Sequence, residues 1–165
     1  MAPRELVISA DVLAPERIQI ITISGQKISK VLRVIPAIMK DIFKLESSAF
    51  YEDEMKFDTS GDPINFYGKW RGRVRKDERT TTWYTIIVQG SESKKDGNGT
   101  TEVRMIGTIT TKLPYDNPLQ IAASQAYLYF SYKEQRRKYI VDSKRMLLDF
   151  DKEVRREFGV VGAET

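Results

Sequence analysis

The sequence predicts an α+β protein in which a curved antiparallel sheet packs around a long C-terminal helix. Two observations lead to this prediction. Between residues 48 and 112, four segments alternate apolar and polar side chains, as consecutive strands do. After them, apolar residues recur at helical spacing as far as residue 158. We expect one domain over residues 1–165, because a chain of this length can bury a core without disulfides or metals.

The composition excludes several kinds of chemistry. The chain contains no cysteine and no histidine. It therefore cannot form a disulfide, a thiolate or histidine metal site, a Ser-His-Asp triad or a Cys-His pair. Only carboxylates, lysines, tyrosines and hydroxyls remain for catalysis. We predict neither a metal site nor a cofactor, and the sequence favours a non-enzymatic role while leaving catalysis open.

The chain carries a small positive charge that is spread along its length. It contains 27 basic and 23 acidic residues, for a net charge of +4. Because a strong nucleic-acid binder concentrates its cations, the arrangement of charge matters more than its sum. No segment reaches the ~20 consecutive apolar residues of a membrane-spanning helix, and the opening MAPRELVISAD lacks the apolar stretch of a signal peptide. We therefore expect a soluble, cytoplasmic protein.

The first part of the chain predicts two strands and a helix. Residues 6–14 alternate apolar and polar side chains, as a half-buried strand does. Residues 17–24 are rich in branched side chains, which favours a strand over the alternative of a short helix. From Gln26 onward apolar residues recur at helical spacing, with Ser24 as a candidate cap. Pro36 is expected to kink or break this helix.

Four further strands are predicted in the middle of the chain. Polar turn sequences connect them, namely TSGDP, KDER and the longer SESKKDGNGT. The expected ranges are residues 48–58, 66–76, 80–90 and 101–112. Because consecutive strands joined by turns pair antiparallel, these segments predict one antiparallel sheet.

A helix over about residues 118–158 is predicted to close the fold. Asn117 is a candidate cap, Pro118 suits the first turn, and Gln120 can reach back to the helix start. Gly159 is expected to end the helix in the left-handed conformation.

This helix is longer than the sheet beside it. At ~1.5 Å per residue it would extend roughly 60 Å, whereas a strand of about ten residues covers only ~33 Å. We therefore expect the helix to bend, split or project beyond the sheet. The charged sequence KEQRRK at 133–138 interrupts the apolar stripe and is the predicted place of that change.

Alternation sorts the predicted strands into an apolar inner face and a charged outer face. On the inner face, aromatic and methionine side chains are suited to lining a pocket for an apolar ligand. The same residue types build an ordinary core, and both interpretations stay open. The candidate ligand-binding residues are Tyr51, Asp53, Met55, Trp70, Tyr84 and Met105.

Asp53 is the unusual member of this group because alternation places it between Tyr51 and Met55. A buried carboxylate needs a partner or serves a ligand, because burial disfavours its ionised form. The alternative is a β-bulge or a shifted register that turns Asp53 to the outside.

The outer face carries a basic stripe of Arg71, Arg73 and Arg75. If the first hairpin closes so that its apolar faces coincide, Met55 lies opposite Trp70. The same register places Glu54 opposite Arg71 and Glu52 opposite Arg73. Such ion pairs would cancel much of the positive field. We therefore favour a solvated charged face over a phosphate-binding surface.

Two other features suggest a partner surface. Trp83 should emerge on the outer face, either as a partner or dimer contact or partly covered by arginine side chains. Arg136 and Arg137 could grip an acidic partner, or belong to a solvated helix face in which Glu134 pairs with Lys138. The candidate partner surface is Arg71, Arg73, Arg75, Trp83, Arg136 and Arg137.

The order of the predicted elements resembles the START and Bet v 1-like helix-grip superfamily, which includes polyketide cyclases. The stretches MIGTITTKLP at 105–114 and YFSYKEQRRKYI at 129–140 correspond to its last long strand and closing helix. The resemblance implies a cavity between sheet and helix for lipids or other apolar molecules, which is catalytic in some members. Other members are co-chaperone modules that act through their surface.

Three functions follow from these observations. The leading hypothesis is binding of a hydrophobic small molecule or lipid-like ligand between the sheet and the C-terminal helix. The first alternative is a nucleic-acid or acidic-partner binding module that uses the outer arginines. The second is a cyclase or isomerase of the same fold that uses Asp53 with a tyrosine.

Overall fold

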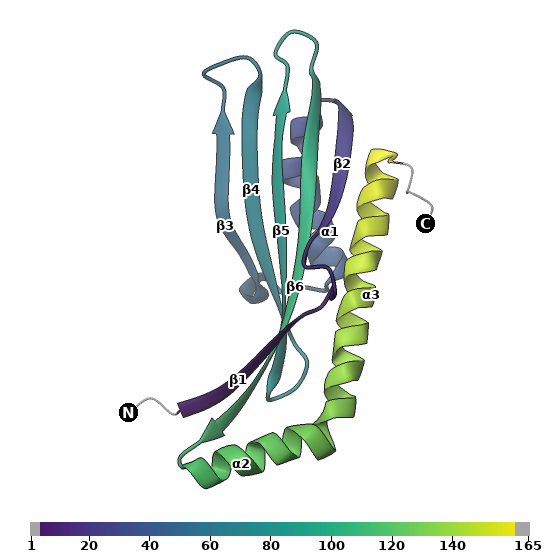
Figure 1. Ribbon diagram of the computed structural model, residues 1–165. Coiled ribbons are helices and arrows are strands. Elements are labelled where there is room, and N and C mark those ends of the chain that lie inside the picture. Colours follow the sequence, from purple (N-terminus) through teal and green to yellow (C-terminus); the bar gives the residue numbers. More distant parts are fainter. Residues whose placement is uncertain (1–3, 161–165) are drawn as a thin grey trace.

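One antiparallel sheet of six strands forms the body of the protein (Figure 1). The computed structural model describes residues 4–160. The strand order is β1-β6-β5-β4-β3, and β2 also pairs with β6. The strands are β1 (Arg4–Asp11), β2 (Gln19–Gln26), β3 (Phe50–Asp58), β4 (Ile64–Arg75), β5 (Thr80–Glu92) and β6 (Asn98–Tyr115). The predicted α+β class with a long C-terminal helix is confirmed.

The strands β1 and β2 share one edge of β6. Asp11 at the end of β1 lies opposite Thr108, and Gln19 at the start of β2 lies opposite Met105. The early branched segment is therefore a strand, as the branched residues favoured. Ser24 lies inside β2 and its hydroxyl shares a hydrogen bond of 3.2 Å with Thr100, so the predicted helix cap is wrong.

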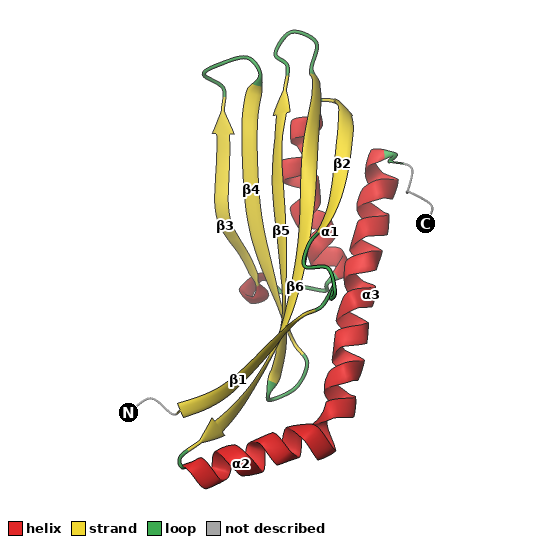
Figure 2. Ribbon diagram, viewed as in Figure 1, coloured by secondary structure: helices red, strands yellow, loops and turns green. Residues whose placement is uncertain are grey.

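The helices α1 (Val31–Ile42) and α3 (Lys133–Phe158) pack against each other and cover one face of the sheet (Figure 2). A 3-10 turn, Ile28–Lys30, precedes α1, and a second, Ser47–Ala49, precedes β3. Pro36 lies inside α1, which continues through it, so no break occurs there. The inner face of the sheet and these two helices share one hydrophobic core.

The C-terminal helix is bent, as its length predicted. Its first part, α2 (Pro118–Tyr127), leads into a π-helical turn, Leu128–Tyr132, from which α3 runs back along the sheet (Figure 1). The bend therefore lies immediately before the charged sequence at 133–138. Both predicted ends are confirmed, because the Asn117 side chain accepts a hydrogen bond from the Gln120 backbone and Gly159 has a φ of 64°.

The first hairpin has a different register from the predicted one. Met55 lies opposite Gly68 rather than Trp70, because a five-residue loop at 59–63 closes the hairpin. A β-bulge then interrupts the pairing between Glu52 and Glu54. A shift by two residues keeps a side chain on its face, but the extra residue of a bulge reverses the faces beyond it. The bulge therefore turns Tyr51 to the outside.

Three aromatic rings organise the core between sheet and helices. The ring of Phe43 stacks on Tyr84 of β5 with centroids 4.1 Å apart, and Phe150 of α3 lies 5.3 Å from Phe43. All three side chains are almost completely buried. Phe43 therefore joins the end of α1 to both the sheet and α3.

Replacement of Phe43 by alanine is expected to lower the free energy of unfolding by about 3–5 kcal/mol, because it removes the central ring and leaves a cavity. Urea denaturation of wild type and variant measures this difference. Phe57→Ala is the matched control, since Phe57 is 50% exposed at the sheet edge and should lose less than about half as much. Equal losses in the two variants would contradict the central role of Phe43.

Candidate functional site

The predicted inner wall is formed, but its residues belong to the core. Trp70, Tyr84 and Met105 face the helices and have no exposed surface. Neither of two surface hollows in residues 4–160 reaches them. The rings of Phe43 and Phe150 occupy the space in front of Tyr84.

Two buried polar atoms on this wall have no hydrogen-bond partner among the described residues. They are the indole nitrogen Nε1 of Trp70 and the hydroxyl of Tyr84. Burial raises the pKa of Tyr84 to about 12, an effect that nearby Ser143 partly offsets. Ser143 makes a hydrogen bond of 2.9 Å with Thr82 and none with the Tyr84 hydroxyl. The inner wall thus keeps two donors without acceptors. Burying each of them without a hydrogen bond lowers the stability of the fold by about 1–3 kcal/mol.

The remaining three inner-face candidates lie elsewhere. Tyr51 is on the outer face, with its ring centroid 5.8 Å from that of Trp83. Asp53 lies in the bulge and accepts hydrogen bonds from Nε and Nη2 of Arg71 at 2.5 and 3.1 Å. The inward position that alternation predicted for Tyr51 is therefore wrong. For Asp53 the alternative interpretation, a β-bulge that turns the carboxylate to the outside, is confirmed. Met55 keeps the inner face but is 41% exposed at the sheet edge.

The contact with Asp53 also keeps Arg71 positively charged. Hydrogen bonding to the Asp53 carboxylate raises the pKa of Arg71, although partial burial opposes the rise. The guanidinium lies 5.1 Å from the ring centroid of Trp83 and 5.6 Å from that of Tyr51. Arg71 is therefore paired and covers the outer tryptophan, and it is not a free cation.

A hollow of about 980 Å³, here called the outer groove, lies on the side of the sheet opposite α1 and α3. Strands β1, β4, β5 and β6 and the segment 44–49 contribute its walls. Its cations are Lys44, Arg73, Arg75, Arg79 and Lys112. Its carboxylates are Glu5, Glu46 and Glu78. Trp83 and the hydroxyls of Ser48, Thr81 and Thr110 complete the polar and aromatic lining.

Several cations of the outer groove lack a carboxylate partner. Among residues 4–160, Lys44, Arg73 and Arg75 take part in no ion pair. The predicted pair of Glu52 with Arg73 does not form, because the bulge places Glu52 opposite Trp70 on the inner face. The strand arginines are therefore less neutralised than the sequence indicated.

The other two cations of the groove are partly engaged. Lys112 lies 3.9 Å from Glu5, a distance that leaves the pair weak and solvated. Arg79 donates a hydrogen bond of 3.1 Å to the Tyr127 hydroxyl, and its guanidinium lies 5.0 Å from the same ring. Neither contact removes the positive charge of the groove.

The two helix arginines do not join the outer groove. Arg136 extends toward the inner side of the sheet, where its Nε donates to the Thr111 hydroxyl at 3.2 Å. Burial lowers the pKa of Arg136. Arg137 is exposed and lies 3.8 Å from the carboxylate of Glu134. Glu134 therefore pairs with Arg137 and not with Lys138, which was its predicted partner. The expected single surface of strand and helix arginines is therefore wrong, because the helix covers the opposite face.

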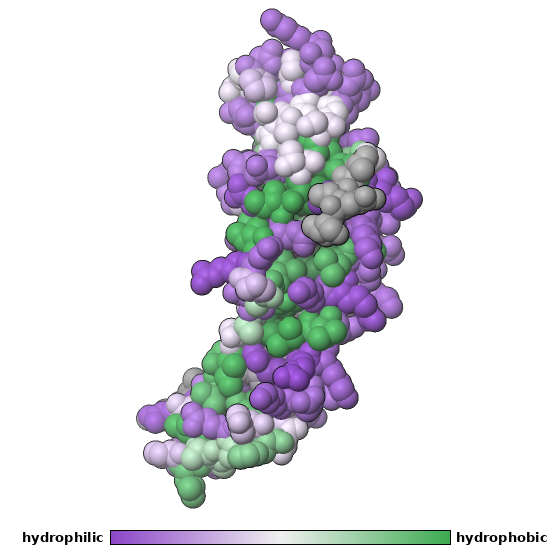
Figure 3. All heavy atoms as spheres, turned by 45° about the vertical axis from the view of Figure 1, so that its right-hand side comes forward, coloured by the Kyte–Doolittle hydropathy of each residue, from purple (hydrophilic) through white to green (hydrophobic). Residues whose placement is uncertain are grey.

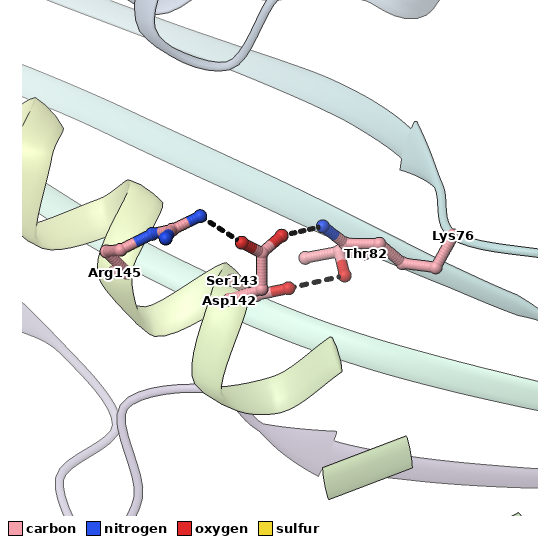
Figure 4. A network of polar contacts seen from close by, with 5 residues as sticks. All are labelled: Lys76, Thr82, Asp142, Ser143 and Arg145. Atoms are coloured by element: carbon pink, nitrogen blue, oxygen red, sulfur yellow. Dashed lines mark hydrogen bonds and ion pairs between the residues drawn. The ribbon is translucent and has the colours of Figure 1, made fainter. Parts of the chain in front are cut away.

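Polar contacts fix the hairpin beside the groove to α3 (Figure 4). Asp142 accepts a hydrogen bond of 2.7 Å from Lys76 and another from Arg145. The bond from Lys76 lowers the pKa of Asp142. Ser143, the next residue, shares a hydrogen bond with Thr82 of β5. The end of the sheet that carries the groove is thus held in place from its inner side.

The sequence indicated only part of the groove. Arg73, Arg75 and Trp83 follow from alternation along the strands. Lys112 also follows, because it is separated from inward-facing Ile109 by an odd number of positions. Lys44 and Arg79 lie in connections, where alternation gives no information.

Comparison with known proteins does not assign the chain to a family. No protein-family model matches the sequence, and no curated protein matches it significantly. Within residues 4–160, no helix is both long and apolar enough to cross a membrane.

The replacement Asp142→Asn is expected to lower the free energy of unfolding by about 1 kcal/mol at pH 7, since the pair is partly exposed and screened. The folded-state pKa of Asp142 lies below its unfolded value. The stabilisation is therefore present above the unfolded pKa and is lost as the pH falls through the folded pKa. Urea denaturation at pH 7 and at about pH 2 measures the difference, which should vanish in acid.

Glu153→Gln is the control for this experiment. It removes an ion pair with Arg156, whose side chain is 70% exposed, and should leave stability almost unchanged because water and salt screen the pair. A difference between wild type and Asp142→Asn that persists in acid would exclude the ionised carboxylate as its source.

Proposed function

We propose that the protein is a nucleic-acid-binding module that holds phosphate groups in the outer groove. The observation that carries this proposal is the set of groove cations that have no carboxylate partner among residues 4–160, namely Lys44, Arg73, Arg75 and Arg79. Guanidinium groups suit phosphates because their donors form a planar fork that matches two oxygen atoms. An acidic polypeptide offers similar oxygen atoms, so the experiment below includes one.

The rest of the groove fits the same ligand. Hydroxyl groups of Thr81 and Thr110 can donate hydrogen bonds to phosphate oxygens. The ring of Trp83 borders the groove and can contact a base or sugar. Only five cations face three carboxylates, so we expect moderate affinity with little dependence on base sequence.

Binding should weaken steeply as salt is added. If about four phosphates are neutralised, log K against log salt has a slope of about −3 for a single strand. Arg73→Glu should reduce affinity about tenfold or more and make this slope shallower. Fluorescence anisotropy with labelled RNA and DNA oligonucleotides, from 50 to 300 mM salt as a rough range, measures both effects.

Arg137→Glu is the matched control. It changes the net charge by the same amount as Arg73→Glu, but at an exposed position on α3, on the other side of the sheet from the groove. It should leave affinity almost unchanged. Equal losses in the two variants would show attraction to net charge alone and would exclude the groove. Binding of poly-glutamate with the same dependence on Arg73, but no binding of nucleic acid, would identify an acidic polypeptide as the partner class.

The unused donors on the inner wall favour a second candidate function. The antiparallel sheet and long C-terminal helix are consistent with helix-grip architecture. An apolar ligand with a polar acceptor could accept hydrogen bonds from Trp70 and Tyr84. It would occupy the sheet–helix layer after displacement of the Phe43 ring, which lies against Tyr84.

Tyr84→Phe separates the two states of this layer. If the layer is packed as described, the variant should be about 1 kcal/mol more stable, since it removes a hydroxyl without a partner. If a ligand accepts a hydrogen bond from the Tyr84 hydroxyl, the variant should no longer retain that ligand. Native mass spectrometry of the purified protein detects an extra mass that leaves on unfolding. A bare protein with a stabilised Tyr84→Phe variant would exclude the ligand.

A further inference from the structure

The segment from Asn117 to Tyr132 contains no charged residue, in a chain of which 30% of residues are charged. We call this segment the uncharged arm; it comprises the N-cap of α2, α2 itself and the π-helical turn. It occupies the lower end of the molecule in Figure 1.

The uncharged arm exposes large apolar side chains. Leu119 is 79% exposed, Tyr129 66% and Phe130 80%, and no residue of α2 is buried. Leu119, Ala122 and Ala126 recur at helical spacing and form one exposed stripe along α2. Figure 3 shows hydrophobic residues at this end of the molecule. Such a surface marks a contact site, because exposing it to water is unfavourable.

Contacts behind the stripe hold the arm in one orientation. The Tyr132 hydroxyl donates to Asp77 and shares a hydrogen bond of 2.6 Å with Thr80. The ring of Tyr127 stacks on Tyr132 with centroids 5.8 Å apart, and Arg79 donates to the Tyr127 hydroxyl. The exposed stripe is therefore presented by a fixed helix.

The absence of charge favours a second copy of this chain as the occupant. A basic or acidic partner would be matched by opposite charges, and a helix that lies on a membrane carries cations on its polar face. The arm has neither. Two copies, each with a net charge of +4, repel one another, and a contact through uncharged surfaces adds no further juxtaposition of like charges.

The surroundings of the arm also suit a two-fold contact. In such a contact the same patch of both copies must carry the projecting group and the recess that receives it. The arm projects Leu119 and Phe130, and beside it lies a hollow of about 440 Å³. Its lining includes the apolar residues Leu113 and Pro114, residues of α2 between Gln120 and Tyr127 that are mostly polar, and one residue of each charge, Arg79 and Asp116. We propose that two copies associate through their uncharged arms, with the α2 helices antiparallel across a two-fold axis. This proposal does not depend on the outer groove.

Sedimentation velocity over a wide concentration range tests the association. The wild type should form a dimer, and Leu119→Asp and Phe130→Asp should each raise the dissociation constant about 100-fold or more, because both copies then bring a carboxylate into an apolar contact. Val141→Asp is the control, since Val141 is 63% exposed on α3 outside the arm. It should leave the dimer unchanged.

A crosslink locates the two-fold axis without disturbing the apolar residues. Because the chain lacks cysteine, Ala122→Cys or Ala126→Cys introduces a single thiol. Under oxidation at least one of them should form a covalent dimer rapidly, whereas Gly61→Cys in the distant β3–β4 turn should not.

Three outcomes would overturn the proposal. One is a wild type that stays monomeric at all concentrations. Another is a dimer that Val141→Asp weakens more than the arm variants do. The third is a monomer whose arm binds phosphatidylcholine and phosphatidylglycerol vesicles, which would assign the arm to a lipid surface.

Discussion

The backbone hydrogen bonds of β6 determine how the rest of the molecule is arranged. A long strand needs a partner along both edges, because unpaired backbone groups are costly when buried and open to aggregation when exposed. Strand β5 pairs with residues 99–111 of β6, and β1 and β2 divide the other edge between them. The Lys112 N–H still donates to the Arg79 carbonyl, and residues 113–115 extend beyond this point and are paired only with β1 among the described residues. The C-terminal helix therefore starts beyond the core and has to turn back, which accounts for the bend and for the exposure of α2.

A single extra residue in β3 determines the character of the outer face. Without the bulge at Asp53, the alternation of the strand would place Glu52 among the outer arginines. With it, Glu52 faces inward opposite Trp70 and Asp53 alone pairs with Arg71. Arg73 and Arg75 then line the outer groove, and neither forms an ion pair with a carboxylate of residues 4–160. A local irregularity in the backbone thus changes the electrostatics of a surface to which four strands contribute.

The parts of the fold that depend on local patterns were predictable from the sequence. The inward positions of Trp70, Tyr84 and Met105 follow from a period of two, and the caps at Asn117 and Gly159 follow from the chemistry of single residues. The hairpin register was not predictable. The turn sequence TSGDP at 59–63 marks a connection without fixing which residues pair across it, and the bulge has no distinctive sequence. The groove was only partly predictable, since it joins Glu5 and Lys44 to strands that are far from them in the sequence.

The two proposed surfaces would reinforce each other if both are used. The outer groove has a small excess of positive charge, and few phosphate contacts give weak binding that salt readily reverses. A dimer formed through the uncharged arms carries two grooves on one particle. Once one groove holds a strand, the second meets the same strand at a high effective concentration, so that long ligands bind more tightly than short ones without any new contact. A fixed arm also keeps the distance between the grooves constant, which is the condition under which such a gain is retained. The bend that follows from the length of β6 would in this way connect the architecture of the sheet to the affinity of the assembly.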